Sequence, residues 1–160
     1  MIFVTVGTHE QQFNRLISEI DRLKGERAFD DEVIIQKGFS TYEPRNCRVF
    51  ELLSYEEMQS YQKEARIIIT HGGPASFIYP LTIGKMPIVV PRQKKFDEHV
   101  NDHQLEFCKQ LKERYFPITL IENIQDLQNA ILSYDSQSLS FVSNTGNFVR
   151  AFEEEVIKLF

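Results

Sequence analysis

Cysteines and long apolar runs are scarce in this chain of 160 residues, and each shortage excludes a class of protein. There is no tryptophan, and the only two cysteines, Cys47 and Cys108, lack the paired spacing of a metal site. Because no signal-peptide pattern precedes them, both are expected to be free thiols in a reducing cytoplasm. No apolar run approaches the roughly 18 residues of a membrane span, so contact with lipid is expected only through a surface patch or a partner.

Positive charge is scarce as well. The chain has 18 lysines and arginines against 23 aspartates and glutamates, which gives a net charge of −5. The densest basic cluster is Arg92, Lys94 and Lys95, which is too small to form the basic field of a nucleic-acid-binding protein. No nucleic-acid partner is therefore expected. The hydrophobic share of 42% is typical of a soluble globular protein, and the length favours a single domain.

Short apolar runs alternate with helical patterns along the chain. Runs of β-branched residues predict six strands, and apolar positions at helical spacing predict the helices between them. The expected strands are 1–6, 33–36, 48–53, 66–70, 87–90 and 118–121, and the expected helices are 13–23, a segment beginning at a capping box at Ser54, 74–83, 100–111, 124–132 and 148–160. This alternation predicts an α/β fold, a Rossmann-like doubly wound parallel sheet with right-handed crossovers.

The sequence THGGPAS, residues 70–76, lies where the fourth predicted strand ends. In open parallel sheets, ligands bind at the carboxyl ends of the strands. Gly72 and Gly73 allow a tight turn and a close approach of the backbone, and the proline after them suits the first turn of a helix. The next amides would point outward at a positive helix end, which is a site for a diphosphate, with the Ser76 hydroxyl as a further donor. A plain strand-to-helix turn has the same composition, so the pattern alone leaves both interpretations open.

Two more loops are expected at the same edge of the sheet. Thr8 and His9 follow the first strand, where Thr8 is expected to cap the first helix and His9 is a candidate base, although such a histidine is more often a polar surface residue. The sequence NDHQ, residues 101–104, is expected to begin a helix with its Asn or Asp as the cap. His103 and Gln104 would then present neutral groups that suit sugar hydroxyls.

Other catalytic chemistries find little support. His99 and His103 are four residues apart, as on a zinc-binding helix face, but no carboxylate or thiol completes a ligand set. No metal and no cofactor are therefore expected. The sequence also contains no nucleophile elbow, and neither cysteine has the surroundings of an activated thiol.

Three stretches resemble one family of enzymes: VTVGTHEQQFNRLI, HGGPASF and PIVVPRQKKFDEHVNDHQLEF. They resemble the nucleotide-sugar-binding lobe of a two-lobed (GT-B) glycosyltransferase, the C-terminal domain of glycosyltransferase family 28, over nearly the whole chain. The opening is similar to the small cytosolic subunit of the split transferase that adds N-acetylglucosamine to a dolichol-linked sugar. The other stretches look closer to the corresponding subunit of bacterial capsule and exopolysaccharide galactosyltransferases. A similar lobe forms half of the transferase that makes lipid II.

The resemblance implies an activity and a partner. It implies an inverting transfer of galactose from UDP-galactose to a lipid-diphosphate-linked sugar in capsule or exopolysaccharide synthesis, with a β-1,4 linkage as the expected product. It also implies a membrane-anchored partner subunit that binds the acceptor and holds this chain, one lobe of residues 1–160, at the cytoplasmic face of the plasma membrane. A GT-B enzyme needs two lobes, and this chain supplies one.

The resemblance also implies roles by position. It makes residues 71–76 the diphosphate turn, places Leu53 and Met58 beside the uracil, and makes Arg92 a cation for the leaving UDP. Tyr79 stands where the wider superfamily has a glutamate that holds the ribose. With the strand-end residues Gln36 and Gly38, the expected donor-binding residues are Gly7, Thr8, Gln36, Gly38, Leu53, Met58, His71, Gly72, Gly73, Pro74, Ala75, Ser76, Arg92, Asp102, His103 and Gln104.

Several questions stay open at this stage. The general base is expected in the partner, and His9 is the only local candidate. A noncatalytic module that binds a nucleotide sugar and regulates a partner is the alternative function, and a self-sufficient epimerase or phosphatase built from homodimers is a third. The apolar residues of the last predicted helix could contact the partner or pack on the sheet. They are Phe148, Phe152, Val156 and Phe160.

Overall fold

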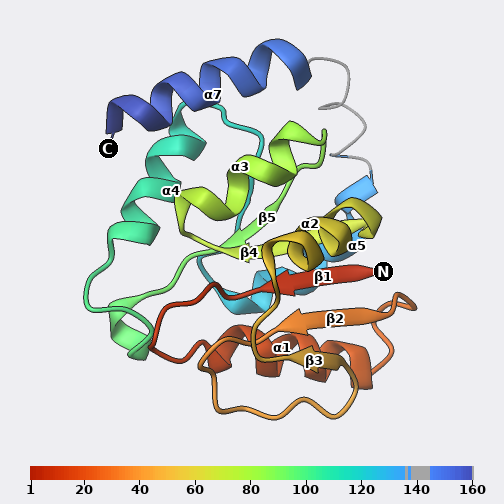
Figure 1. Ribbon diagram of the computed structural model, residues 1–160. Coiled ribbons are helices and arrows are strands. Elements are labelled where there is room, and N and C mark those ends of the chain that lie inside the picture. The colour runs from red at the N-terminus through yellow and green to blue at the C-terminus, as the bar shows by residue number, and fades with distance from the viewer. Residues whose placement is uncertain (136, 138–144, 160) are drawn as a thin grey trace.

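The computed structural model describes residues 1–135, 137 and 145–159, and a parallel β-sheet forms its centre (Figure 1). The six strands are β1 (Ile2–Thr5), β2 (Val33–Gln36), β3 (Arg48–Phe50), β4 (Ile67–His71), β5 (Ile88–Val90) and β6 (Thr119–Leu120). Their order in the sheet is β3-β2-β1-β4-β5-β6, and each neighbouring pair is parallel. This is the doubly wound α/β fold that the sequence predicted. The strand order reverses between β1 and β4, where such folds bind ligands.

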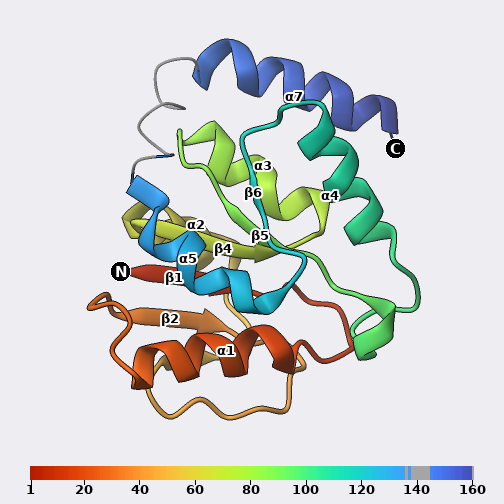
Figure 2. The same ribbon diagram turned by 180° about the vertical axis from the view of Figure 1, so that it is seen from behind.

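Helices cover both faces of the sheet (Figures 1 and 2). One face packs against α1 (Asn14–Gly25) and α5 (Leu127–Leu132), and the other against α2 (Tyr55–Glu64), α3 (Pro74–Thr82) and α4 (His103–Glu113). Alternate residues of a strand point to opposite faces. Accordingly, Ile2 and Val4 of β1 belong to the core under α1, whereas Phe3 packs with residues of α2. Two short 3₁₀ helices, η1 (Lys94–Phe96) and η2 (Ile124–Asp126), complete the connections.

The local capping predictions had different outcomes. The capping box is confirmed, because the Ser54 hydroxyl accepts a hydrogen bond from the Glu57 amide and the Glu57 carboxylate accepts one from the Ser54 amide. The prediction that Thr8 caps the first helix is wrong. α1 begins only at Asn14, whose amide donates to the side-chain oxygen of Gln12. Thr8 instead lies in a long loop between β1 and α1.

The C-terminal helix α7 (Thr145–Leu159) lies across α3 and α4 (Figure 1). The ring centroids of Phe148 and Phe152 lie 5.3 and 5.0 Å from that of Phe116, and Phe152 is 1% exposed. These two phenylalanines therefore pack on the layer of helices over the sheet. The side chain of Val156 and residue Phe160, which were also candidates for partner contact, lie outside the described part. No described helix combines the length and the apolar character that crossing a membrane requires.

Asp31 is predicted to make folding sensitive to acid. Its carboxylate accepts from the amino group of Met1 at 3.1 Å and from Arg66 at 2.6 Å, and the Arg66 contact does most to lower the pKa of Asp31 to about 2. The unfolded value is about 3.9. The stabilisation is thus complete above pH 4 and is lost as the pH falls toward 2. We expect Asp31→Asn to remove about 1–2 kcal/mol of unfolding free energy at pH 7, after allowance for solvent screening at Arg66.

Urea titrations at a series of pH values measure this effect. The loss caused by Asp31→Asn should shrink below pH 4 and approach zero below pH 2, where the wild-type carboxyl is protonated as well. Asp30→Asn, at an exposed neighbouring carboxylate, is the matched control and should change stability much less. An equal loss at all pH values would show that the ion pairs of Asp31 are not responsible.

Candidate functional site

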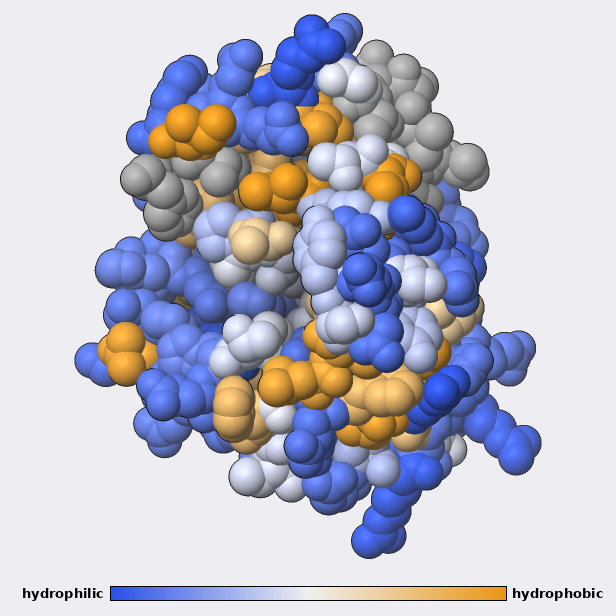
Figure 3. Space-filling model, in the orientation of Figure 1, coloured by the Kyte–Doolittle hydropathy of each residue, from blue (hydrophilic) through white to orange (hydrophobic). Residues whose placement is uncertain are grey.

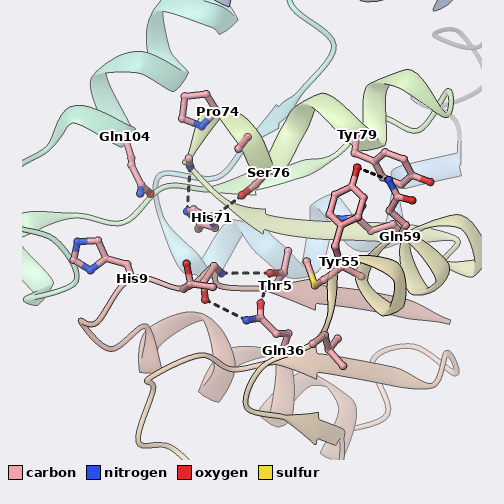
Figure 4. A pocket seen from close by; sticks show the side chains of 17 residues that line it. Thr5, His9, Gln36, Tyr55, Gln59, His71, Pro74, Ser76, Tyr79 and Gln104 are labelled. Carbon is pink, nitrogen blue, oxygen red and sulfur yellow. Dashed lines mark hydrogen bonds between the residues drawn. The ribbon is translucent and has the colours of Figure 1, made fainter. Parts of the chain in front are cut away.

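A cavity of about 610 Å³ opens at the carboxyl ends of β1, β2 and β4, between the loop after β1 and helices α2 and α3 (Figure 4). It lies at the reversal of strand order, and its volume is in the range of small-molecule sites, roughly 300–1,000 Å³. The described residues that line it are Thr5, Gly7, Thr8, His9, Gln36, Leu53, Tyr55, Met58, Gln59, Gln62, His71, Gly73, Pro74, Ala75, Ser76, Tyr79 and Gln104. Most of the donor-binding residues expected from the sequence therefore face one cavity.

A closed set of hydrogen bonds shapes the turn after β1. The Gly7 amide donates to the Thr5 hydroxyl oxygen at 3.3 Å, that hydroxyl donates to the Gln36 side-chain oxygen at 2.5 Å, and the Gln36 amide nitrogen donates to the Gly7 carbonyl at 3.3 Å. Gly7 has a φ of +75° and Gly38 has a φ of +54°, and residues with a Cβ rarely adopt such values. A Cβ on Gly38 would also lie 2.7 Å from the Gly7 carbonyl oxygen. Gln36 and Gly38 thus hold the cavity wall in place.

The imidazole of His71 lies between two glycines of the cavity wall. A Cβ on Gly7 would approach its Nε2 to 2.5 Å, and a Cβ on Gly73 would approach its Cε1 to 2.4 Å. Its Nδ1 accepts from the Gly73 amide at 3.1 Å, and its Nε2 is 2.7 Å from the Ser76 hydroxyl oxygen. Burial lowers the pKa of His71 to about 4, and the positive charge of Arg92 acts in the same direction. The imidazole is therefore neutral at neutral pH.

Gln104 links two loops of the site. Its side-chain oxygen accepts from the backbone amides of Gly72 at 3.0 Å and Arg92 at 3.1 Å. Because these amides can only donate, the network assigns the side-chain nitrogen of Gln104 to the remaining position, as a donor on the cavity side. Gly72 lies behind this contact and does not line the cavity. A Cβ at Gly72 would lie 2.8 Å from the Cβ of Gln104, so the position has no room for a side chain.

The cavity wall offers hydrogen-bond donors without formal charge. None of the lining residues that the structure describes is an aspartate, glutamate, lysine or arginine. Pro74 is the first residue of α3, so the Ala75 amide has no partner within the helix and lies at its positive end. Together with the Ser76 hydroxyl and the Gln104 side-chain nitrogen, it forms a donor set that suits phosphate oxygens. Leu53 and Met58 make the opposite end apolar.

Comparison with known protein families agrees with this fold. The model of the glycosyltransferase family 28 C-terminal domain matches residues 1–160. The chain belongs to this family. The family 28 domain is also 35% identical over 119 residues to the human protein "UDP-N-acetylglucosamine transferase subunit ALG13". That alignment covers 69% of this chain but only 10% of the human protein, so the chain spans about a tenth of the length of this curated relative.

Solved glycosyltransferases share the fold of the family 28 domain. The glycosyltransferase of kitacinnamycin superposes with a TM-score of 0.66 at 17% identity, over 94% of this chain and 39% of the other. The spinosyn forosaminyltransferase SpnP superposes with a TM-score of 0.64 at 18% identity, over 96% of this chain and 39% of the other. At such identities the likeness concerns the fold alone. In each case the matched lobe is about two-fifths of the longer chain.

Arg92 of the family 28 domain has a different position from the one expected. Its side chain is fully buried, and its guanidinium donates to four backbone carbonyls instead of facing the cavity. The acceptors are Val6 and Gln11 at 2.8 Å, Gln12 at 3.2 Å and Glu98 at 3.0 Å. Burial lowers the pKa of Arg92 to about 10. Arg92 thus joins the loop after β1 to the loop after β5 and does not line the cavity.

The NDHQ segment contributes only Gln104 to the cavity lining. The Asn101 side-chain oxygen accepts from the His103 amide at the start of α4, and the Asp102 carboxylate accepts from the Lys94 amide at 2.8 Å. Asp102 occupies the N-cap position of α4, but its side chain makes no capping hydrogen bond, and Asn101 bonds only the first helical amide from one residue further out. His103 is exposed and lies, with Asp102, outside the cavity wall.

His9 lines the cavity but is arranged as a donor. Its Nδ1 accepts from the Gln11 amide at 3.1 Å, so the proton of a neutral ring resides on Nε2. A general base needs a free lone pair, and in this arrangement neither ring nitrogen offers one. The His9 ring also stacks on His99, with centroids 4.6 Å apart.

Most of the residues that α2 contributes to the cavity were not predicted from the sequence. Tyr55, Gln59 and Gln62 line the cavity beside Met58, and the Gln59 side-chain nitrogen donates to the Tyr55 hydroxyl at 2.6 Å (Figure 4). These positions follow the spacing i, i+3, i+4 and i+7, which places them on one face of a helix. The sequence therefore carried a signal for a binding face on this helix, because the face combines polar amides with aromatic and apolar side chains. Tyr79 likewise lies one turn after Ser76 on α3.

Proposed function

We propose that this family 28 domain is the donor-binding subunit of an inverting glycosyltransferase that uses a UDP-sugar. The observation that carries the proposal is the uncharged donor set at the start of α3, made by Ala75, Ser76 and Gln104 at one end of the 610 Å³ cavity. A positive helix end and neutral donors can bind a diphosphate and stabilise the charge on a departing UDP. The name of the human relative, a UDP-N-acetylglucosamine transferase subunit, supports a UDP-sugar donor.

In the proposed complex, the diphosphate lies against the first turn of α3. The uridine extends toward the α2 end of the cavity, where Leu53, Tyr55 and Met58 supply apolar contacts. The transferred sugar lies toward Gln104 and the start of α4. Following the resemblance of the sequence to capsule and exopolysaccharide enzymes, we propose galactose as the sugar and a lipid-diphosphate-linked saccharide as the acceptor.

We further propose that a membrane-anchored partner covers the cavity mouth and brings the acceptor. Five large apolar side chains that are 40–75% exposed lie in the segments that follow β2, β3 and β5. These segments are at the same edge of the sheet as the cavity. They are Phe39, Leu52, Tyr55, Phe96 and Val100. Hydrophobic side chains gather over β3 and the segment that leads into α2 (Figure 3). The matched lobe forms only two-fifths of the similar solved chains, which supports a second lobe as the occupant of this surface. The partner would also supply the general base, because His9 is arranged as a donor.

Ligand binding and transfer test the proposal separately. In a thermal-shift panel with UDP, UDP-galactose, UDP-glucose and UDP-N-acetylglucosamine, we expect UDP and one sugar nucleotide to raise the melting temperature. At 100 times the dissociation constant the stabilisation is about 2.7 kcal/mol, which corresponds to about 5–10 °C for a domain of this size. Labelled sugar should reach a lipid-linked acceptor only when the chain is coexpressed with its membrane partner. Absence of any nucleotide-dependent shift would contradict the proposal.

A regulatory module is the second candidate, and the arrangement of His9 favours it, because no free base faces the cavity among the described residues. This function requires nucleotide-sugar binding without turnover in any pairing with a partner. The coexpression assay distinguishes the two functions, since only the catalytic subunit converts binding into product. Epimerase activity of the isolated chain would exclude both.

A further inference from the structure

A row of hydrogen-bonding groups runs through the turn after β4. It joins the Gly73 amide, the two ring nitrogens of His71 and the Ser76 hydroxyl (Figure 4). Resting on the proposed diphosphate site, we infer that His71 is a positioning residue that fixes the Ser76 hydroxyl as a hydrogen-bond donor toward the cavity. His71 then acts on the ligand through Ser76.

The proton of the His71 imidazole has a defined position. A backbone amide can only donate, so the contact of 3.1 Å from the Gly73 nitrogen requires an unprotonated Nδ1 on His71. A neutral imidazole has one ring proton, which must therefore reside on Nε2. Burial keeps the ring neutral by holding the pKa of His71 to about 4.

The Ser76 hydroxyl has a defined direction as a result. Nε2 lies 2.7 Å from the Ser76 oxygen, and because Nε2 carries the proton, that oxygen is the acceptor. The hydroxyl proton of Ser76 must then point away from His71. Ser76 lines the cavity, and its oxygen donates to no protein acceptor in the hydrogen bonds found among the described residues. The hydroxyl can therefore donate to an acceptor such as a phosphate oxygen.

The His71 ring has no room to rearrange. The imidazole occupies the space that a Cβ would fill at both Gly7 and Gly73, with separations of 2.5 and 2.4 Å from its ring atoms. The ring is thus confined by backbone on two sides and held by a hydrogen bond at each nitrogen. This confinement keeps the donor direction of Ser76 constant before a ligand arrives, which lowers the cost of ordering the site on binding.

Nuclear magnetic resonance of the isolated chain tests, without a ligand, which ring nitrogen of His71 carries the proton. In a spectrum of ¹⁵N-labelled histidines, couplings between ring protons and nitrogens identify which nitrogen carries the proton. We expect the Nε2-protonated form for His71, and likewise for His9, whose Nδ1 also accepts from a backbone amide. Exposed His103 serves as the reference. An Nδ1-protonated or doubly protonated His71 at neutral pH would overturn the inference, and this result is independent of the proposed function.

Binding measurements test whether the Ser76 hydroxyl, oriented by His71, donates to the ligand. His71→Asn keeps an oxygen near the position of Nδ1 for the Gly73 amide but cannot reach Ser76, and Ser76→Ala removes the hydroxyl alone. Each is expected to lower the affinity for UDP by about 10- to 100-fold, since a hydrogen bond to a charged group is lost. The double variant should lose no more than either single variant, because both act through one hydroxyl. Uridine, which lacks phosphate, should bind all four proteins equally.

The outcomes separate the inference from the proposed function. If the losses of the two variants multiply, His71 and Ser76 act independently and the positioning role is wrong. If uridine affinity falls as much as UDP affinity, the effect is a general distortion and the role is again wrong. If wild-type protein binds no UDP, the proposed function fails, while the proton position of His71 remains measurable. Should His71→Asn fail to fold, the wild-type spectrum and Ser76→Ala with UDP and uridine still decide the matter.

Discussion

Replacing Gly73 by alanine is expected to lower the affinity for UDP by about 10- to 100-fold while the protein remains folded. The backbone of Gly73 has an ordinary φ of −74°, so alanine introduces no conformational strain. Its Cβ, however, would lie 2.4 Å from the His71 ring, which cannot move toward Gly7 on its other side. The ring or the turn must shift, and the loss of a hydrogen bond to a charged phosphate costs about 1.5–3 kcal/mol, which is about 10- to 100-fold in affinity.

Isothermal titration with UDP and thermal unfolding without ligand measure the two parts of this prediction. Gly146→Ala is the matched control, because a Cβ at Gly146 meets no atom within 4 Å. It lies in α7, where alanine is the better helix former, so UDP affinity should be unchanged and stability equal or slightly higher. Unchanged affinity in Gly73→Ala would mean that the turn after β4 does not hold the nucleotide.

Replacing Arg92 by methionine is expected to lower the free energy of unfolding by about 3–5 kcal/mol. Methionine has similar length but no donors, so four backbone carbonyls lose their partner at Arg92. Unsatisfied buried polar groups cost about 1–3 kcal/mol each. Since domains are stable by only about 5–15 kcal/mol, a large part of the total would disappear. Urea unfolding at pH 7 measures the change.

Arg22→Met is the control for Arg92→Met. The Arg22 side chain is 48% exposed, and its ion pairs with Glu19 and Glu26 lie on the surface of α1. Exposed pairs contribute about 0–1 kcal/mol, so this variant should remain nearly as stable as the wild type. If Arg92→Met instead kept full stability and lost UDP affinity, the burial argument would be wrong. Arg92 would then have the role that the sequence suggested, as the cation at the leaving group.

The fold could be predicted because its determinants are local and periodic. Apolar runs such as 67–69, followed by helical spacing, indicate buried parallel strands whatever their order in the sheet. The turn after β4 was also predictable, since Gly72, Gly73 and Pro74 restrict a strand-to-helix connection to few conformations. The boundaries of β3 and α4 were less accurate, because hydrophobic pattern alone does not show where ladder or helix hydrogen bonds end.

The burial of individual polar side chains could not be predicted. Arg92 belongs to a hydrophilic run with Lys94 and Lys95, and only those two lysines are exposed. Its burial depends on carbonyls from the distant loop after β1, which local patterning does not reveal. The same loop explains the error at Thr8, because the segment contacted by Arg92 stays non-helical up to Phe13. Long-range contacts between loops thus determine which polar side chains are buried and where α1 begins, and local sequence patterns do not show these contacts.

If the cavity binds a UDP-sugar as proposed, the absence of charge from the described cavity wall affects the release of the product nucleotide. When the bond to the sugar breaks, the nucleotide that remains acquires additional negative charge on its outer phosphate. A wall with lysine or arginine would hold this spent nucleotide more tightly than the intact donor. The uncharged lining of this domain offers no such extra attraction beyond that of one helix end, so in the proposed reaction no fixed positive charge would slow the release of UDP.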